Sequence, residues 1–298
     1  MTEAEIERIA VRRLSVPHVR RATPLHRFAQ VVAGCAWLLL IAGALVTSTG
    51  SSLSVPDWPL SFGKILPPML GGVRFEHGHR MIAGTVAILT FVLAGWLARR
   101  EERRWVRVLG YCAAGAIVLQ ALLGGATVLL RLPPPVSISH ACLAEAVFCL
   151  LVCVAQATSP WFESLPTGHA GGLWKIGAFA TGAVYLQIAL GALLRHTGMG
   201  LPAHVLWAGG ATIAVLVAST RGASALPEEY GLFGPSAFMS LIIPAQLLLG
   251  YFSFRVRFSP DFTAGVSLGA FVTAAHLAVG ALLLATCMTW TLRAVRCR

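Results

Sequence analysis

The sequence predicts an all-α membrane protein with eight transmembrane helices, arranged as two pseudo-symmetric four-helix bundles with both termini in the cytoplasm. Three observations support this prediction. The chain is 56% hydrophobic and only 12% charged, whereas soluble domains carry about 25% charged residues. Its apolar residues gather in runs close to the roughly 20 residues that cross a bilayer as a helix. Its basic residues are distributed unevenly between the two sides of these runs.

Eight runs of the 298-residue chain are long and apolar enough to span a membrane. The last of them is long enough to be tilted or to extend past the lipid. In chain order the expected spans are Phe28–Thr47, His79–Leu97, Val106–Leu130, His140–Ala157, Trp174–Leu194, Ala203–Ser219, Leu232–Phe254 and Ala264–Leu292.

The basic residues predict how the spans are oriented. When successive spans alternate in direction, 16 of the 23 Lys and Arg residues lie on the side of the N-terminus and 7 lie on the other side. Cytoplasmic loops carry such an excess, so both termini are expected in the cytoplasm. The net charge of +11 follows from this topology. No basic recognition helix or aromatic stacking motif indicates a nucleic-acid partner.

The first 26 residues are expected to be a cytoplasmic segment. They have no apolar core of a signal peptide, and Glu3, Glu5 and Glu7 are atypical of a mitochondrial transit peptide. Thr2 and Glu5 have the spacing of a capping box, so a short interfacial helix is expected here. The predicted location is therefore the cytoplasmic membrane of a bacterium, with the lipid bilayer as its surroundings.

An internal repeat divides the spans into two halves of four. Related phrases lie at Leu119–Gly125, Leu186–Gly191 and Ala245–Gly250, with Ile41–Val46 in the same place of the first span. After each phrase come an outer loop and a helix with a histidine in its early part. These four histidines are His79, His140, His204 and His276. By contrast, His18, His26 and His169 are expected to be solvated on the cytoplasmic surface.

Four histidines from four different helices favour bis-histidine heme sites over zinc. Zinc sites need three or four ligands close together, often two on one helix four residues apart, and this spacing is absent. A heme needs one imidazole from each of two facing helices in an apolar bundle. Two halves with two histidines each would therefore form two heme sites.

Arginines at the outer ends of the spans have two interpretations. They can neutralise the anionic propionates of a heme, or they can extend to lipid headgroups as arginines in spans commonly do. The residues concerned are Arg80, Arg131, Arg195, Arg255 and Arg257.

The first outer loop and the helix after it carry the candidate chemistry. Asp57 and Trp58 lie between prolines, which predicts a rigid lid. Glu76 lies three residues before His79 on the same helix face. It can act there as a base or as a charge that stabilises a cation, although an acid at a helix N-terminus is also favoured by the helix dipole alone. Glu145 is the one acid inside a span and has no predicted partner.

These residues resemble the heme A synthase family, whose members oxidise heme O to heme A for terminal oxidases. The resemblance extends from about Phe28 to Leu292. It rests on the loop phrase Thr-Gly-Ser-x-Leu-x-x-Pro-Asp-Trp-Pro-Leu, on Glu-x-x-His-Arg at the second span, on Arg195–Leu201, and on the four histidines. Two features depart from the family. Val55 stands where a cysteine is common, and the second-half loop is shortened to Leu201-Pro-Ala-His204.

The resemblance implies that successive segments of the chain have different functions. Residues 1–26 would be the cytoplasmic segment, 27–158 the substrate-heme half, 159–172 a cytoplasmic linker and 173–298 the cofactor-heme half. His79 and His140 would ligate or flank the substrate heme, with Glu76 as the essential carboxylate. His204 and His276 would hold heme b.

The implied reaction oxidises a ring methyl of heme O to a formyl group, which would make the protein an oxidoreductase. Heme O synthase and an unidentified electron donor or acceptor are its candidate partners. The alternative is a non-catalytic bis-histidine membrane cytochrome or heme carrier, which the same histidines would serve. Glu76 and the Pro-Asp-Trp loop favour the enzyme, because electron transfer needs neither.

Overall fold

The computed structural model describes residues 22–166, 171–224, 231–258 and 266–298, and it confirms the predicted all-α fold. Eight helices in these ranges are long and apolar enough to cross a membrane, as predicted. Their bounds are α2 (Pro24–Ser48), α3 (Val73–Arg100), α4 (Arg104–Leu129), α5 (Pro134–Ala157), α7 (Leu173–Thr197), α8 (Leu201–Ser224), α10 (Phe233–Phe258) and α11 (Val266–Arg296). A short helix, α6 (Pro160–Glu163), follows α5. The interfacial helix predicted near Thr2 lies outside the described residues.

Most of the helices extend beyond the apolar runs that predicted them. At the start of α2, the Thr23 side chain accepts a hydrogen bond from the backbone nitrogen of His26 at 3.1 Å, and Pro24 follows it. Such capping satisfies a backbone donor that the first helical turn leaves free. α3 begins at Val73 and α5 begins at Pro134. The histidines expected at the starts of these spans therefore lie more than one turn inside their helices.

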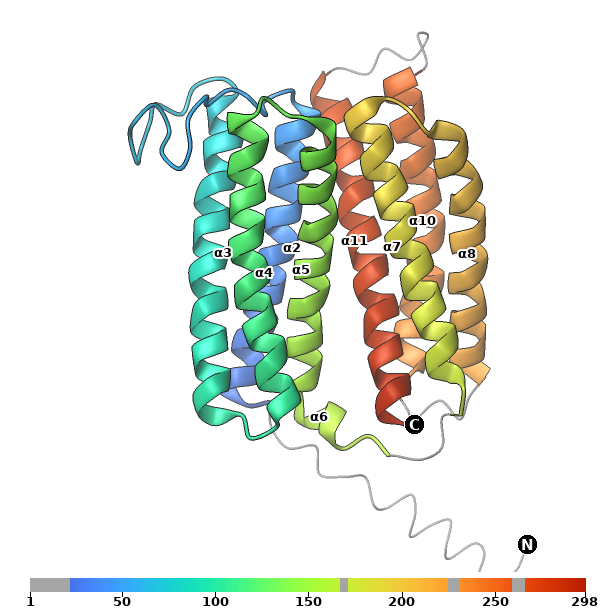
Figure 1. Cartoon of the computed structure of the whole chain (residues 1–298). Helices are drawn as coiled ribbons and strands as arrows, with labels where there is room; N and C mark the ends of the chain where they lie inside the picture. The colour runs from blue at the N-terminus through green and yellow to red at the C-terminus, as the bar shows by residue number, and fades with distance from the viewer. Residues whose placement is uncertain (1–21, 167–170, 225–230, 259–265) are drawn as a thin grey trace, which may run out of the picture.

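The eight helices form two groups of four with the same order of neighbours (Figure 1). In the first group α3 and α5 each pack against both α2 and α4. In the second group α8 and α11 each pack against both α7 and α10. α3 and α5 therefore lie diagonally across the first group, and α8 and α11 lie diagonally across the second. The groups meet where α11 packs against α2 and α5, and where α5 packs against α7.

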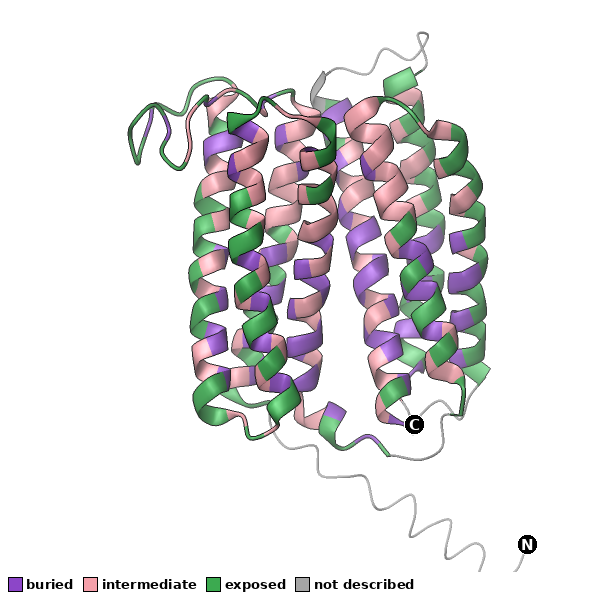
Figure 2. Ribbon diagram, viewed as in Figure 1, coloured by how far each residue is buried: buried purple, intermediate pink, exposed green. Residues whose placement is uncertain are grey.

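Small side chains and one indole hold the two groups together. Ala281 and Ala285 of α11 belong to the buried cluster of the first group. The Trp37 indole of α2 donates to the backbone oxygen of Ala278 at 3.0 Å. Alanine at such positions lets helices approach closely. Figure 2 shows more fully buried residues in the lower part of the molecule than in the upper part.

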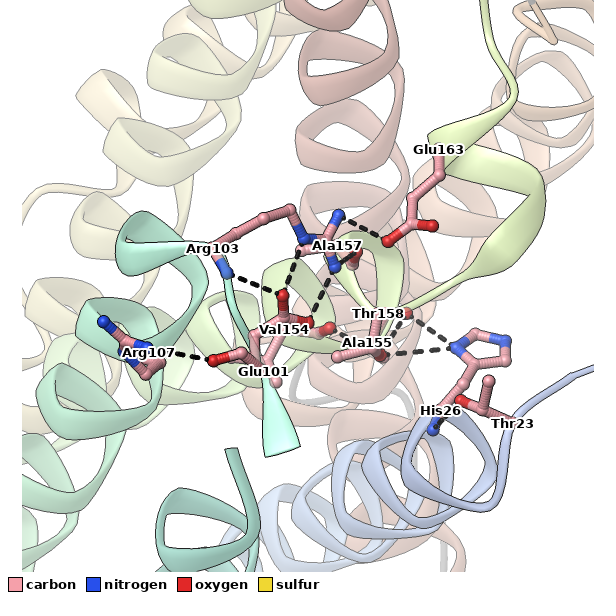
Figure 3. A network of polar contacts seen from close by, with 10 residues as sticks. All are labelled: Thr23, His26, Glu101, Arg103, Arg107, Val154, Ala155, Ala157, Thr158 and Glu163. Atoms are coloured by element: carbon pink, nitrogen blue, oxygen red, sulfur yellow. Dashed lines mark hydrogen bonds and ion pairs between the residues drawn. The ribbon is translucent and has the colours of Figure 1, made fainter. Parts of the chain in front are cut away.

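The rim that carries α6, here named the lower rim, is closed by a polar network around Arg103 (Figure 3). Arg103 pairs with Glu101 at 2.8 Å and with Glu163 at 2.9 Å, and it donates to the backbone oxygen of Ala157 at 2.8 Å. The connection between α3 and α4 is thereby joined to the end of α5 and to α6. The hydrogen bonds from Arg103 lower the pKa of Glu101 below its ordinary value.

The expectation that His26 is solvated is wrong. Its side chain is 9% exposed, and Nδ1 lies 2.9 Å from the backbone oxygen of Ala155. The ring fills the junction between the first turn of α2 and the last turn of α5, where it satisfies a carbonyl near the helix end. His18 and His169 lie outside the described residues.

Candidate functional site

Each of the four repeated histidines rests on a glycine of a neighbouring helix. A Cβ atom added to any of these glycines would lie 3.1 Å from the Cε1 atom of the facing imidazole, which is closer than ordinary van der Waals contact. We name the four contacts the glycine notches. They join Gly43 to His79, Gly124 to His140, Gly191 to His204, and Gly250 to His276.

The structure arranges the four histidines as two pairs. His79 on α3 and His140 on α5 lie on diagonal helices and within electrostatic range of each other. His204 on α8 and His276 on α11 repeat this relation in the second group. All four side chains are half-buried. Each group therefore presents two imidazoles from opposite helices of the same bundle.

The chemistry of these pairs fits a heme better than a single metal ion. Among the described residues, no three His, Cys, Asp or Glu side chains come close enough to hold an ion. The Nδ1 atoms of His79, His140 and His276 are buried, and none has a hydrogen-bond partner in the described part of the chain. An imidazole that binds iron through Nε2 keeps its proton on Nδ1, and its position is set by what surrounds that side of the ring. The glycine notches lie against Cε1, the ring carbon between the two nitrogens, and so fix how far each imidazole reaches.

Glu76 is buried and both of its oxygen atoms are engaged. Oε1 pairs with Arg80 one turn later on α3 at 2.7 Å, and Oε2 accepts from the backbone nitrogen of Val55 at 2.9 Å. Only 3% of the residue is exposed. The carboxylate predicted to do chemistry thus also ties the loop to α3.

Arg80 fastens the loop that the sequence predicts to be a rigid lid. Its guanidinium donates to the backbone oxygens of Asp57 at 2.7 Å, Leu60 at 2.9 Å and Val55 at 3.3 Å. The Arg80 guanidinium thus donates to three carbonyls of the loop. The structure gives Arg80 these partners in addition to Glu76.

Two side chains of the loop help to fix its position, Asp57 by contacts within the loop and Trp58 by a contact with α4. Asp57 accepts from the backbone nitrogens of Gly63 at 2.8 Å and Phe62 at 2.7 Å, and these bonds hold the pKa of Asp57 below its ordinary value. The Trp58 ring lies against Gly125 of α4, where an added Cβ would lie 2.7 Å from it. The loop therefore reaches from α3 to α4, beside the notch at Gly124.

Arg195 and Arg257 concentrate positive charge at the junction of the two groups. Arg195 of α7 donates to Ser48 of α2 at 2.5 Å and to the backbone oxygen of Ala44 at 2.9 Å. Arg257 donates to the backbone oxygen of Arg195 at 3.2 Å. Neither arginine has a carboxylate partner among the described residues. Such a site favours an anionic group.

The other two predicted arginines, Arg131 and Arg255, have the following surroundings. Arg131 is exposed at the end of α4 with a φ of 59°. Arg255 donates to the Tyr251 hydroxyl at 2.9 Å one turn earlier on α10.

Glu145 lies between the two groups rather than beside a histidine pair. It is 3% exposed, its Oε2 atom has no hydrogen-bond partner, and it interacts electrostatically with Tyr185 of α7. Glu145 therefore belongs to the contact between α5 and α7.

Sequence reasoning missed the glycine notches, although their signal was present. The repeated phrases served to divide the spans into two halves, yet their glycines face imidazoles. The structure also shifts the register of the first phrase. Gly43 occupies the notch, so the matching segment is Leu38–Gly43 rather than Ile41–Val46.

A model of one protein family matches half of the chain. The family is described as cytochrome oxidase assembly protein, and the match covers residues 73–223. This range includes Glu76 and three of the four notch histidines.

Curated relatives from three bacteria are named heme A synthase. The protein of Bacillus licheniformis is 31% identical over 170 residues, which cover 55% of this chain and 56% of the relative. That of Lysinibacillus sphaericus is 31% identical over 170 residues, with 55% of each protein covered. That of Alkalihalophilus pseudofirmus is 35% identical over 95 residues, 30% of this chain and 32% of the relative. The chain matches about half the length of the first two relatives.

Proposed function

The chain belongs to the cytochrome oxidase assembly protein family, and from this membership we propose that it is a heme A synthase that oxidises a ring methyl of heme O to a formyl group. The observation that carries the proposal is the repeated notch, which presents a histidine pair in each of two four-helix groups. The names of the bacterial relatives support the same reaction.

In this proposal the two histidine pairs bind different hemes. His79 and His140 ligate or flank heme O, the substrate, and His204 and His276 hold heme b as the cofactor. Heme b supplies one-electron redox chemistry when bound. The half-buried imidazoles and the apolar helix faces around them would limit the access of water to a bound heme.

The charged residues act at the edge of the substrate site. Glu76 lies one turn before His79 on α3 and keeps a negative charge there, as a base or as a stabiliser of positive charge on the substrate edge. Its bond to Arg80 must loosen before it can accept a proton. Arg195 and Arg257, together with Arg131 and Arg255, are the proposed contacts of heme propionates. Arg80, Asp57 and Trp58 hold the loop over this end of the group.

The decisive experiment is extraction and mass analysis of hemes from cells that express the chain with and without a heme O synthase. Heme b should copurify in both cases, and heme A should form only when heme O is supplied. A protein that binds heme b but leaves heme O unchanged would instead be a membrane cytochrome or heme carrier.

The variant Glu76→Gln tests the carboxylate. Its amide oxygen can still accept from Val55, so the loop contact should survive while the negative charge is lost. We expect heme A formation to fall by about 10²-fold or more, with the heme b spectrum unchanged. Glu102→Gln, an exposed glutamate at the lower rim, is the matched control. Full activity of Glu76→Gln would remove Glu76 from the mechanism.

A further inference from the structure

Each glycine notch is preceded, four residues earlier, by a residue whose backbone carbonyl faces the same histidine ring. Residues four apart share a helix face, so the two residues form one surface against the imidazole. The four preceding residues are Leu39, Gln120, Gln187 and Gln246. Three notches therefore contain a glutamine, and the notch of His79 contains a leucine.

Two of the glutamine side chains reach the histidine residue that they face, Gln187 at the ring and Gln120 at the backbone. The Nε2 atom of Gln187 lies 3.2 Å from Nδ1 and 3.3 Å from Nε2 of His204. The Nε2 atom of Gln120 donates to the backbone oxygen of His140 at 3.0 Å. Both amides are thus placed at a histidine of the neighbouring helix rather than at solvent or lipid.

Gln246 is placed in the same way against α11. Its Nε2 atom lies 3.0 Å from the position of a Cβ added to Gly280, one turn after His276. An alanine there would crowd the amide. Gly280 therefore makes room for the Gln246 side chain beside the turn that carries the histidine.

The three amides carry an acceptor that the protein leaves unused. The Oε1 atoms of Gln120, Gln187 and Gln246 are buried and have no hydrogen-bond partner among the residues that the structure describes. The terminal amide torsion of glutamine is broad and roughly two-fold, so a half-turn exchanges Oε1 and Nε2. A histidine bound to iron through Nε2 offers its Nδ1 proton to such an acceptor, which makes the ring a stronger ligand. The side chain of Leu39 offers no second acceptor to His79 beside the backbone carbonyl that all four residues share.

We propose that Gln120, Gln187 and Gln246 are positioning residues that hold the heme-ligating histidines through their Nδ1 protons, and that Leu39 leaves His79 as the ligand that releases iron most readily. This inference rests on the proposed function and deepens it. Both histidines of the second group have a glutamine, and the first group has one. The difference explains how one fold keeps a heme as cofactor in one half and exchanges a heme as substrate and product in the other.

Heme loss from single-site proteins tests the proposal, with heme b as the probe and excess apomyoglobin as the acceptor. The pair His204→Ala and His276→Ala leaves a site only in the first group, and the pair His79→Ala and His140→Ala leaves one only in the second. Leu39→Gln should slow heme loss from the first site about tenfold, and Gln187→Leu should speed it from the second about tenfold. Gln156→Leu, a glutamine near the lower rim, is the control.

Two further measurements separate hydrogen bonding from packing. Gln187→Glu keeps an acceptor oxygen, so it should retain heme better than Gln187→Leu. Loss of the Nδ1 hydrogen bond in Gln187→Leu should favour the reduced iron about tenfold, a rise in midpoint potential of about 59 mV for one electron. Equal heme loss and equal potential in wild type, Leu39→Gln and Gln187→Leu would overturn the inference alone. A wild-type chain that binds no heme would overturn the proposed function as well.

Discussion

At the scale of single residues, glycine sets how far each imidazole reaches into its bundle. The ring of His276 occupies the space that a side chain at position 250 would fill. A glycine inside a helix costs about 1 kcal/mol relative to alanine, and the same cost recurs at all four notches. The contact with histidine is the physical reason for placing glycine there.

The variant Gly250→Leu tests this reason. The leucine should displace His276, because its Cβ atom alone would lie 3.1 Å from Cε1. We expect the heme content of the second group to fall by at least half, while the helix content by circular dichroism is retained, since leucine is a good helix former. Gly182→Leu is the control, because a Cβ at Gly182 meets no atom within 4 Å. Equal heme content in both variants would contradict the role of the notch.

At the scale of elements, the loop between α2 and α3 is an ordered structure fastened by side chains. Arg80 binds its carbonyls, the Ser61 hydroxyl lies 2.8 Å from Nδ1 of His77, and Trp58 packs on α4. Asp57 closes the turn at Phe62 and Gly63 from within. The prediction of a rigid segment between prolines therefore agrees with the contacts, although its function as a lid stays a prediction.

The pH dependence of this loop follows from Asp57. Its folded-state pKa lies below the ordinary value of about 3.9, chiefly because the backbone nitrogens of Gly63 and Phe62 bind the charged form. The stabilisation of the loop by the ionised Asp57 carboxylate is therefore present above the ordinary pKa, and it is lost as pH falls through the folded-state pKa. We expect Asp57→Asn to increase cleavage of the loop by an added protease at pH 7, compared with wild type. Unchanged cleavage would contradict a role of Asp57 in ordering the loop.

At the scale of the whole molecule, polar contacts lie at both ends of the helices. At one end they join the two helix groups, and at the lower rim they join the α3–α4 connection to α5 and α6. Ser48 of α2 accepts from Arg195 of α7 and from Thr273 of α11, the latter at 2.8 Å. At the lower rim, Arg103 joins two glutamates and the end of α5. Polar bonds at such places stabilise an arrangement that apolar packing in lipid specifies only weakly.

The Arg103 network predicts a stability that depends on pH. The folded-state pKa of Glu101 lies below its ordinary value because Arg103 binds the carboxylate. The stabilisation is therefore complete above the ordinary value of about 4.3 and is lost as pH falls through the folded-state pKa. In detergent at pH 7, Glu101→Gln should lower the free energy of unfolding by about 1 kcal/mol, measured as a lower Tm. Glu102→Gln should have no effect, and an equal Tm for both variants would contradict the role of Glu101.

Much of the fold could be predicted because the signals are local. Eight apolar runs predict eight spans, and the repeated phrases place His79, His140, His204 and His276 in corresponding segments. The bounds were less accurate, since α3 starts six residues before His79. Polar residues at helix ends carry no apolar signal, yet they continue the backbone hydrogen bonds of the helix.

By itself the sequence determined that this chain is an eight-span membrane protein with four matched histidines, because span length and residue spacing are properties of the chain alone. Only the tertiary structure decided what those histidines face. It brought Gly43 of α2 against His79 of α3, and it placed Leu39 at the position that glutamine occupies in the other three notches. It also brought Arg195 against α2, some 150 residues away. These contacts depend on how helices rotate against each other, and that rotation follows from the packing of all of them together.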